Sequence, residues 1–100
     1  MPADSAPAAP PAPVPAGPWR PVLARSVILR HDRVRDADLL LMPERAVLLS
    51  REGGRILRLC DGRRTLPDII AELARTYRDA PLDKDVPDFL TRIRKEGWLR

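Results

Sequence analysis

The sequence predicts a small α+β domain, in which a three-stranded antiparallel sheet is followed by three helices. The first half of the chain contains short apolar runs bounded by charge clusters or proline, which are typical of strands. In the second half, apolar side chains recur at helical spacing. The 100 residues, of which 44% are hydrophobic, suffice for one such domain. Strands that precede helices in this way favour the α+β class.

The first 18 residues differ in composition from the rest, since they contain seven Pro and six Ala. Such a segment has too little apolar side chain to offset the entropy of ordering it. Residues 1–18 are therefore predicted to be a disordered, extended linker, and residues 19–100 the folded domain. A linker of this kind usually joins two domains, and a ragged natural terminus is the alternative. The sequence shows neither a signal peptide nor the roughly 18 apolar residues of a membrane span.

Three strands are predicted at residues 26–30, 37–42 and 45–49. Residues 32–36 and the pair Pro43-Glu44 supply the two reversals between them. An antiparallel meander is the simplest arrangement, and it places the third strand at an edge of the sheet. Both faces of that strand would be hydrophobic, because it is apolar at consecutive positions. We expect one face of the sheet to stay partly exposed unless the linker or a second copy of the chain covers it.

Two helices are predicted next, each with a capping residue at its start. Ser50 can cap a helix that runs to about Cys60. Gly53 and Gly54 weaken this helix by roughly 1 kcal/mol each relative to Ala, so we expect them to permit a close approach of the backbone to a neighbour. Thr65 can cap the second helix. The core stripe of that helix comprises Leu66, Ile69, Ile70, Leu73 and Tyr77.

The third helix is predicted to begin near residue 83 or 85, so that Pro87 falls in the first turn, where proline is tolerated. It is expected to stop at Gly97. With Gly97 just past the helix end, Trp98 and Ile93 form the hydrophobic pair that accompanies a Schellman ending. Trp98 is therefore interpreted as a packing residue.

The reactive side chains do not form a catalytic or metal-binding set. The single cysteine, Cys60, lies on the apolar side of its helix and is interpreted as a small buried hydrophobe. The single histidine, His31, is interpreted as a surface residue. One Cys and one His supply neither a metal-ligand set nor a nucleophile with a base. We therefore expect no enzyme activity, no metal and no cofactor, and a reducing, cytoplasmic setting fits the lone cysteine.

Four short motifs occur in a characteristic order. They are Met42-Pro43-Glu44, Ala46-Val47-Leu48-Leu49-Ser50, Leu59-Cys60-Asp61-Gly62-Arg63-Arg64-Thr65 and Asp85-Val86. With these motifs, residues 19–100 resemble the pyrroloquinoline quinone biosynthesis protein D (PqqD) family, a recognition element for ribosomally made precursor peptides. The resemblance implies a winged helix-turn-helix assembly and a role as a peptide chaperone. Such a chaperone would bind the precursor peptide PqqA and present it to the radical S-adenosylmethionine enzyme PqqE, and a PqqC oxidase domain could be fused to it.

The resemblance also implies a binding site, because in related domains the leader peptide adds to the third strand, beside the third helix. An edge strand offers free backbone groups for this pairing. On the strand side the implied residues are Arg45, Ala46, Val47, Leu48, Leu49 and Ser50. On the helix side they are Asp85, Val86, Phe89, Leu90, Arg92 and Ile93, some of which must belong to the core. Ser50 departs from the family, which often has Asn there, so its role as helix cap or strand end stays open.

Two other functions are compatible with this fold. A DNA-binding winged helix would need a basic recognition helix, but residues 83–97 carry four basic and four acidic side chains. The chain has a net charge of +4, and its one clearly basic region comprises Arg20, Arg25, Arg30, Arg33 and Arg35. This region could steer an acidic peptide or protein surface as well as DNA. The second alternative is a dimerisation or scaffold module, which the linker would hold beside an enzyme. We expect no nucleic-acid or membrane partner.

Overall fold

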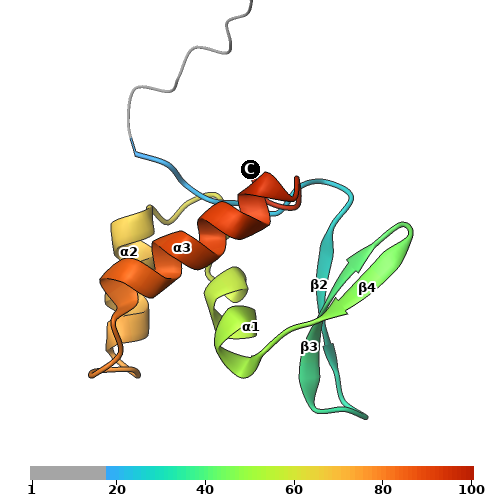
Figure 1. Cartoon of the computed structure of the whole chain (residues 1–100), viewed down its shortest axis with the longest axis horizontal. Coiled ribbons are helices and arrows are strands. Elements are labelled where there is room, and N and C mark those ends of the chain that lie inside the picture. Colours follow the sequence, from blue (N-terminus) through green and yellow to red (C-terminus); the bar gives the residue numbers. More distant parts are fainter. Residues whose placement is uncertain (1–17) are drawn as a thin grey trace, which may run out of the picture.

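The computed structural model describes residues 18–100. The strands are β2 (Ile28–Asp32), β3 (Ala37–Met42) and β4 (Arg45–Leu48), and the helices are α1 (Arg51–Arg58), α2 (Leu66–Ala74) and α3 (Leu82–Lys95). The predicted α+β class is therefore confirmed, whereas the winged helix-turn-helix assembly stays a prediction. Figure 1 shows the sheet at one end of the molecule, with α1 between the sheet and α2. The predicted linker, residues 1–18, lies outside the described residues except for Pro18.

The sheet is the predicted antiparallel meander, in the order β2-β3-β4. β3 has the predicted bounds and β4 ends one residue early, but the prediction for β2 was wrong at both ends. The N–H of Val27 donates to the carbonyl of Ala24 at 3.0 Å and closes a turn, so the strand begins only at Ile28. It then continues to Asp32, which pairs with Ala37 on β3.

The predicted caps of α1 and α2 are confirmed. Ser50 Oγ accepts a hydrogen bond from Gly53 N–H at 3.0 Å. Thr65 and Asp68 form a capping box, in which each side chain accepts a hydrogen bond from the backbone N–H of the other, at 3.2 and 3.0 Å. These bonds satisfy N–H groups that a helix start leaves without partners. Ser50 thereby fixes the point at which the chain leaves β4 and enters α1.

The start of α3 differs from the prediction. The helix begins at Leu82 instead of residue 83 or 85, because the Pro81 carbonyl already accepts a hydrogen bond from Asp85 N–H at 2.9 Å. Within residues 18–100, no side chain caps this end of α3. Pro87 therefore lies inside the helix, beyond the first turn, where it removes one helical hydrogen-bond donor.

The end of α3 follows the predicted Schellman geometry. Gly97 has a φ of +85°, a conformation that glycine adopts at least cost. The N–H of Trp98 donates to the Ile93 carbonyl at 3.2 Å, and the N–H of Gly97 donates to the Arg94 carbonyl at 3.0 Å. Trp98 then packs against the hydrophobic core, which confirms the packing role predicted for it.

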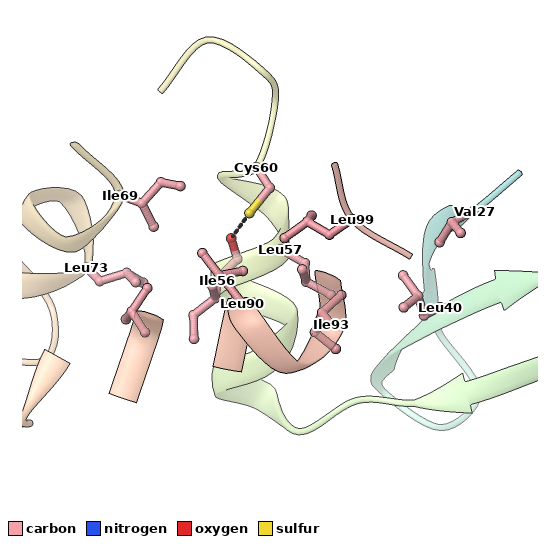
Figure 2. Packing of buried hydrophobic residues seen from close by; sticks show 11 residues of the cluster. Val27, Leu40, Ile56, Leu57, Cys60, Ile69, Leu73, Leu90, Ile93 and Leu99 are labelled. Atoms are coloured by element: carbon pink, nitrogen blue, oxygen red, sulfur yellow. Dashed lines mark hydrogen bonds between the residues drawn. The ribbon is translucent and has the colours of Figure 1, made fainter. Parts of the chain in front are cut away.

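The hydrophobic core surrounds α1, as Figure 2 shows. β3 and the three helices contribute fully buried side chains, including Leu40 from β3, Leu57 from α1, Ile69 from α2 and Leu90 from α3. The buried set comprises Val27, Leu40, Ile56, Leu57, Cys60, Ile69, Leu73, Val86, Leu90, Ile93 and Leu99. Cys60 belongs to this set, as predicted, and burial raises the pKa of its thiol to about 12.

The two ends of the described chain pair with each other, which the sequence did not predict. Val22 and Arg100 exchange two backbone hydrogen bonds, at 3.1 and 2.7 Å. The N–H of Ala24 donates to the Trp98 carbonyl at 2.9 Å, and the indole N–H of Trp19 donates to the Arg100 carbonyl at 3.0 Å. Residues 19–24 are thus tied to the last residues of the chain by backbone pairing, which we call the terminal pairing.

A buried carboxylate joins the sheet to α1. Asp38 on β3 is only 8% exposed, and its Oδ1 lies 2.9 Å from His31 Nδ1 and 2.6 Å from Arg58 Nη2. The hydrogen bond with His31, together with the Arg58 charge, holds the pKa of Asp38 below its ordinary value. Gly54 of α1 packs directly on this carboxylate, since a Cβ at residue 54 would lie 2.8 Å from Asp38 Cγ. The close approach predicted for Gly54 is therefore confirmed. We call His31, Asp38 and Arg58 the Asp38 cluster.

Candidate functional site

β4 is an edge strand whose outer backbone groups are free within the described chain. The N–H of Leu49, just past β4, donates to the carbonyl of Asp38 at 2.9 Å. In an antiparallel pair, residues alternate between facing the partner strand and facing away from it. Ala46 and Leu48 therefore point their N–H and C=O groups away from β3. The two isolated bridges among residues 18–100 lie elsewhere, so neither of them occupies this edge.

The side chains of β4 alternate between two faces of the sheet. Val47 lies opposite the fully buried Leu40 and is partly buried against the core. Ala46 and Leu48 point to the other face, where Leu48 is 61% exposed. Ile28 of β2 shares that outer face and is 56% exposed. In the described chain the outer face of the sheet therefore stays partly exposed, as the consecutive apolar residues predicted.

A groove of about 650 Å³ lies between the start of α1 and one side of α3. Its buried or partly buried lining is apolar and consists of Gly53, Ile56 and Phe89. A Cβ at Gly53 would lie 3.2 Å from Phe89 Cζ, so glycine at this position allows the aromatic ring to lie against the α1 backbone. The exposed lining residues are Ser50, Glu52, Asp85, Asp88, Thr91, Arg92 and Lys95.

The segment from Arg45 to Ser50 runs opposite to α3, and of this segment Ser50 alone lines the groove. At one end, the guanidinium of Arg45 lies over the ring of Trp98, with Cζ 5.4 Å from the ring centroid, just past the end of α3. At the other end, Ser50 follows β4 and lines the groove together with Asp85 and Phe89 of α3. The start of β4 therefore lies near the end of α3, and Ser50, which follows β4, reaches the groove beside Phe89.

The structure divides the predicted helix-side residues into two sets. Asp85, Phe89 and Arg92 line the groove, together with Ser50 from the strand side. Val86, Leu90 and Ile93 lie in the core and are almost fully buried, so they offer little side-chain surface to a ligand. The remaining strand-side residues, Arg45, Ala46, Val47, Leu48 and Leu49, form the β4 edge and its continuation.

Several groove residues were missed by the sequence prediction. They are Glu52, Gly53, Ile56, Asp88, Thr91 and Lys95. Helical spacing is the signal that could have found the α3 members, because Asp88, Arg92 and Lys95 follow Asp85 at intervals of three and four residues. The α1 members could not be found in this way, since they reach the groove only through the packing of α1 against α3.

Within the described residues, no group of three or more His, Cys, Asp or Glu side chains is placed to hold a metal ion. The Cys60 thiol is buried and remains protonated at neutral pH, because its pKa is raised to about 12. No helix in residues 18–100 has the length and apolar character needed to cross a bilayer. The chemistry offered by the groove is therefore that of a binding surface with free backbone groups beside it.

Comparison with known proteins identifies relatives across most of the chain. The family model described as coenzyme PQQ synthesis protein D (PqqD) matches residues 39–99. A protein of Pseudomonas paraeruginosa named PqqA binding protein is 35% identical over 80 residues, which cover 79% of this chain and 87% of the relative. A protein of Gluconobacter oxydans with the same name is 38% identical over 79 residues, covering 76% of this chain and 81% of the relative.

A solved structure has the same fold. It is the solution NMR structure of the PqqD truncation of Methylobacterium extorquens PqqCD, described as a functional and stand-alone recognition element for ribosomally synthesised and post-translationally modified peptides. The two chains are 36% identical, with a TM-score of 0.64, and the match covers 80% of this chain and 87% of the other.

Proposed function

Because this chain belongs to the PqqD family, we propose that it is a peptide chaperone in pyrroloquinoline quinone biosynthesis. It binds the precursor peptide PqqA and presents it to the radical S-adenosylmethionine enzyme PqqE. Two curated relatives that are named PqqA binding protein support the first step. The domain itself is not an enzyme: it contributes the position of the peptide, and the chemistry belongs to the cofactors of PqqE.

The observation that carries this proposal is the open edge of β4 beside the groove. The peptide adds to the sheet as a strand, and its backbone pairs with the free N–H and C=O groups of Ala46 and Leu48. Backbone pairing of this kind supplies affinity, while the groove between α1 and α3 supplies selectivity through side-chain contacts. The apolar lining around Phe89 offers a place for one apolar side chain of the peptide.

The proposal is tested by titrating ¹⁵N-labelled protein with synthetic PqqA. We expect the amide resonances of Ala46, Leu48, Phe89 and Arg92 to shift together and to saturate with one affinity. Shifts confined to other surfaces, or none at high peptide concentration, would show that the peptide does not bind at this edge. Adding PqqE to the saturated complex then tests presentation, because the enzyme should broaden the peptide-bound resonances further.

A pair of substitutions at residue 46 separates backbone pairing from side-chain contact. Ala46→Pro removes an N–H that points away from β3, so the β3–β4 ladder should survive while one bond to the peptide is lost. Ala46→Val keeps the N–H and enlarges the side chain more than proline does. We expect Ala46→Pro to weaken PqqA binding about tenfold and Ala46→Val to change it less than threefold. Equal binding by the two variants would exclude strand addition at this position.

A PqqC-type oxidase is a second proposed neighbour of this domain. The solved relative is a truncation of a protein called PqqCD, so in that protein a PqqD unit belongs to a longer chain. The Pro- and Ala-rich residues 1–18 would act as a tether that keeps such a neighbour at high local concentration. Copurification of the chain with separately expressed PqqC, compared with residues 19–100 alone, would show whether the contact is made by the folded domain.

A further inference from the structure

The charges on the groove side of α3 are sorted by sign along the helix. Asp85 and Asp88 line the groove in the first half of α3, and Arg92 and Lys95 line it in the second half. At a rise of 1.5 Å per residue, the stripe from residue 85 to residue 95 spans about 15 Å. An extended peptide covers this length with about four or five residues. The groove therefore presents an acidic end and a basic end within one short strand length.

The opposite wall adds one charged residue to the groove lining. Glu52 of α1 also lines the groove, whereas Arg45 of β4 lies outside this lining, past the end of α3 and over Trp98. The compensating charges are few. Lys84 binds Asp88 at 2.9 Å at the acidic end, and Glu44 and Glu96 lie near Arg45 at the basic end.

Among the residues that line the groove, the acidic groups are thus Glu52, Asp85 and Asp88, and the basic groups are Arg92 and Lys95. An acidic start and a basic end also complement the dipole of α3. Glu52 likewise lies in the first turn of α1, where it complements the dipole of that helix. The helix dipoles thus favour an acidic residue at the start of each helix, and Glu52 adds a third acidic group to the groove.

The apolar part of the groove lies between the two charged ends. Phe89 follows Asp88 and precedes Arg92 on α3, and its ring packs on Gly53 of α1. A guest side chain that enters here meets carbon atoms, while the residues two positions before and after it, which share its face of the strand, meet charges of opposite sign. The two ends of the groove therefore differ, so that a bound peptide can be oriented in it.

We propose that, if the peptide-binding role proposed above holds, this groove selects a segment with a basic residue, then an apolar residue, then an acidic residue, spread over about five positions. The basic residue comes first because the guest pairs antiparallel to β4. Antiparallel pairing continues the pattern of the existing sheet and is the more stable kind per residue. Since β4 runs from the basic end to the acidic end, an antiparallel guest enters at Ser50 and leaves at Arg45. The charges of the groove then set the direction and the register of the guest strand. Backbone pairing alone selects neither.

The test is competition binding at low salt with PqqA and with a PqqA variant in which acidic and basic residues are exchanged. We expect the exchange to weaken binding about tenfold, and salt to reduce the difference. A protein variant with Asp85→Lys, Asp88→Lys, Arg92→Glu and Lys95→Glu should reverse the preference. The matched control exchanges the charges of an ion pair on α2, Glu72→Arg with Arg75→Glu, and should bind like the unaltered protein.

The outcomes separate this inference from the proposed function. Equal affinity for the two peptides, with the β4 amides still shifting, would overturn the charge selection and leave the peptide-binding role intact. Preference for the exchanged peptide would overturn the antiparallel direction. No binding of either peptide would overturn the proposed function itself. The measurements on the unaltered protein decide between these outcomes even if the fourfold variant fails to fold.

Discussion

Replacing Gly54 by Ala tests whether the Asp38 cluster holds the sheet against α1. The added methyl group would overlap Asp38 Oδ2 and would lie 2.8 Å from Asp38 Cγ, so the carboxylate must move. Its interactions with His31 and Arg58 would then weaken. Two charge-assisted hydrogen bonds, at about 1.5 kcal/mol each, amount to about 3 kcal/mol. Alanine restores about 1 kcal/mol of helix propensity, which leaves an expected net destabilisation of about 2 kcal/mol.

Gly53→Ala is the matched control, because it brings the same gain in helix propensity one residue away. A Cβ at Gly53 would meet Phe89 Cζ at 3.2 Å and Ser50 Oγ at 3.1 Å, both of them side-chain atoms. We expect its free energy of unfolding to stay within about 1 kcal/mol of that of the unaltered protein. Gly54→Ala should instead lower the Tm by about 8 to 16 °C, measured by circular dichroism.

A double substitution shows whether the Asp38 carboxylate is the cause. In an Asp38→Ala background the methyl group at residue 54 no longer meets a carboxylate, so Gly54→Ala should become neutral or stabilising by about 1 kcal/mol. Equal melting temperatures of the two single glycine variants, or additive losses in the double variant, would refute this account of the sheet–helix contact.

Three further predictions concern stability and reactivity. Asp38 has a lowered pKa in the folded protein, where His31 and Arg58 contact its carboxylate and Asp36 lies 3.4 Å from the other ring nitrogen of His31. Its stabilising contribution relative to an Asp38→Asn variant should therefore be full above the ordinary pKa of 3.8 and disappear as the pH falls below it, as followed by urea unfolding. Thr65→Ala should cost about 1 kcal/mol of stability, since it removes the N-cap of α2, whereas Thr65→Ser should cost less; equal losses would argue against the capping bond. Cys60 should resist alkylation by iodoacetamide at about pH 8 and react readily in denaturant, and rapid reaction of the folded protein would contradict its burial.

Local signals were sufficient to predict much of the fold. The caps at Ser50 and Thr65 and the Schellman ending at Gly97 depend on residues within a few positions of each other, so the sequence pattern contains them in full. The start of α3 was misplaced because the backbone carbonyl of Pro81 accepts the first hydrogen bond of the helix. Every residue type has such a carbonyl, so the sequence does not mark this position. The start of β2 was predicted too early, because the N–H of Val27 is already used in a hydrogen bond to the Ala24 carbonyl, which closes a turn before the strand.

The candidate site was harder to predict, because burial on α3 depends on which neighbours the helix meets. Val86, Phe89 and Leu90 are all apolar, yet only Phe89 lines the groove, since it packs over Gly53. The Asp38 cluster draws one residue each from β2, β3 and α1, and nothing in the pattern around residues 31 or 58 relates them. Such contacts between distant positions are set by the assembled fold.

The terminal pairing means that entry to and exit from the domain lie at one spot, since Val22 and Arg100 bond to each other directly. A unit built in this way can be grafted into a surface loop of a host protein, or closed into a ring, without stretching its backbone. It also makes the last residues structural, because removing Leu99 and Arg100 would take away the hydrogen-bond partner of the Trp19 indole and both bonds between Val22 and Arg100, and would leave the start of the domain held by the Ala24–Trp98 and Pro21–Gly62 bonds.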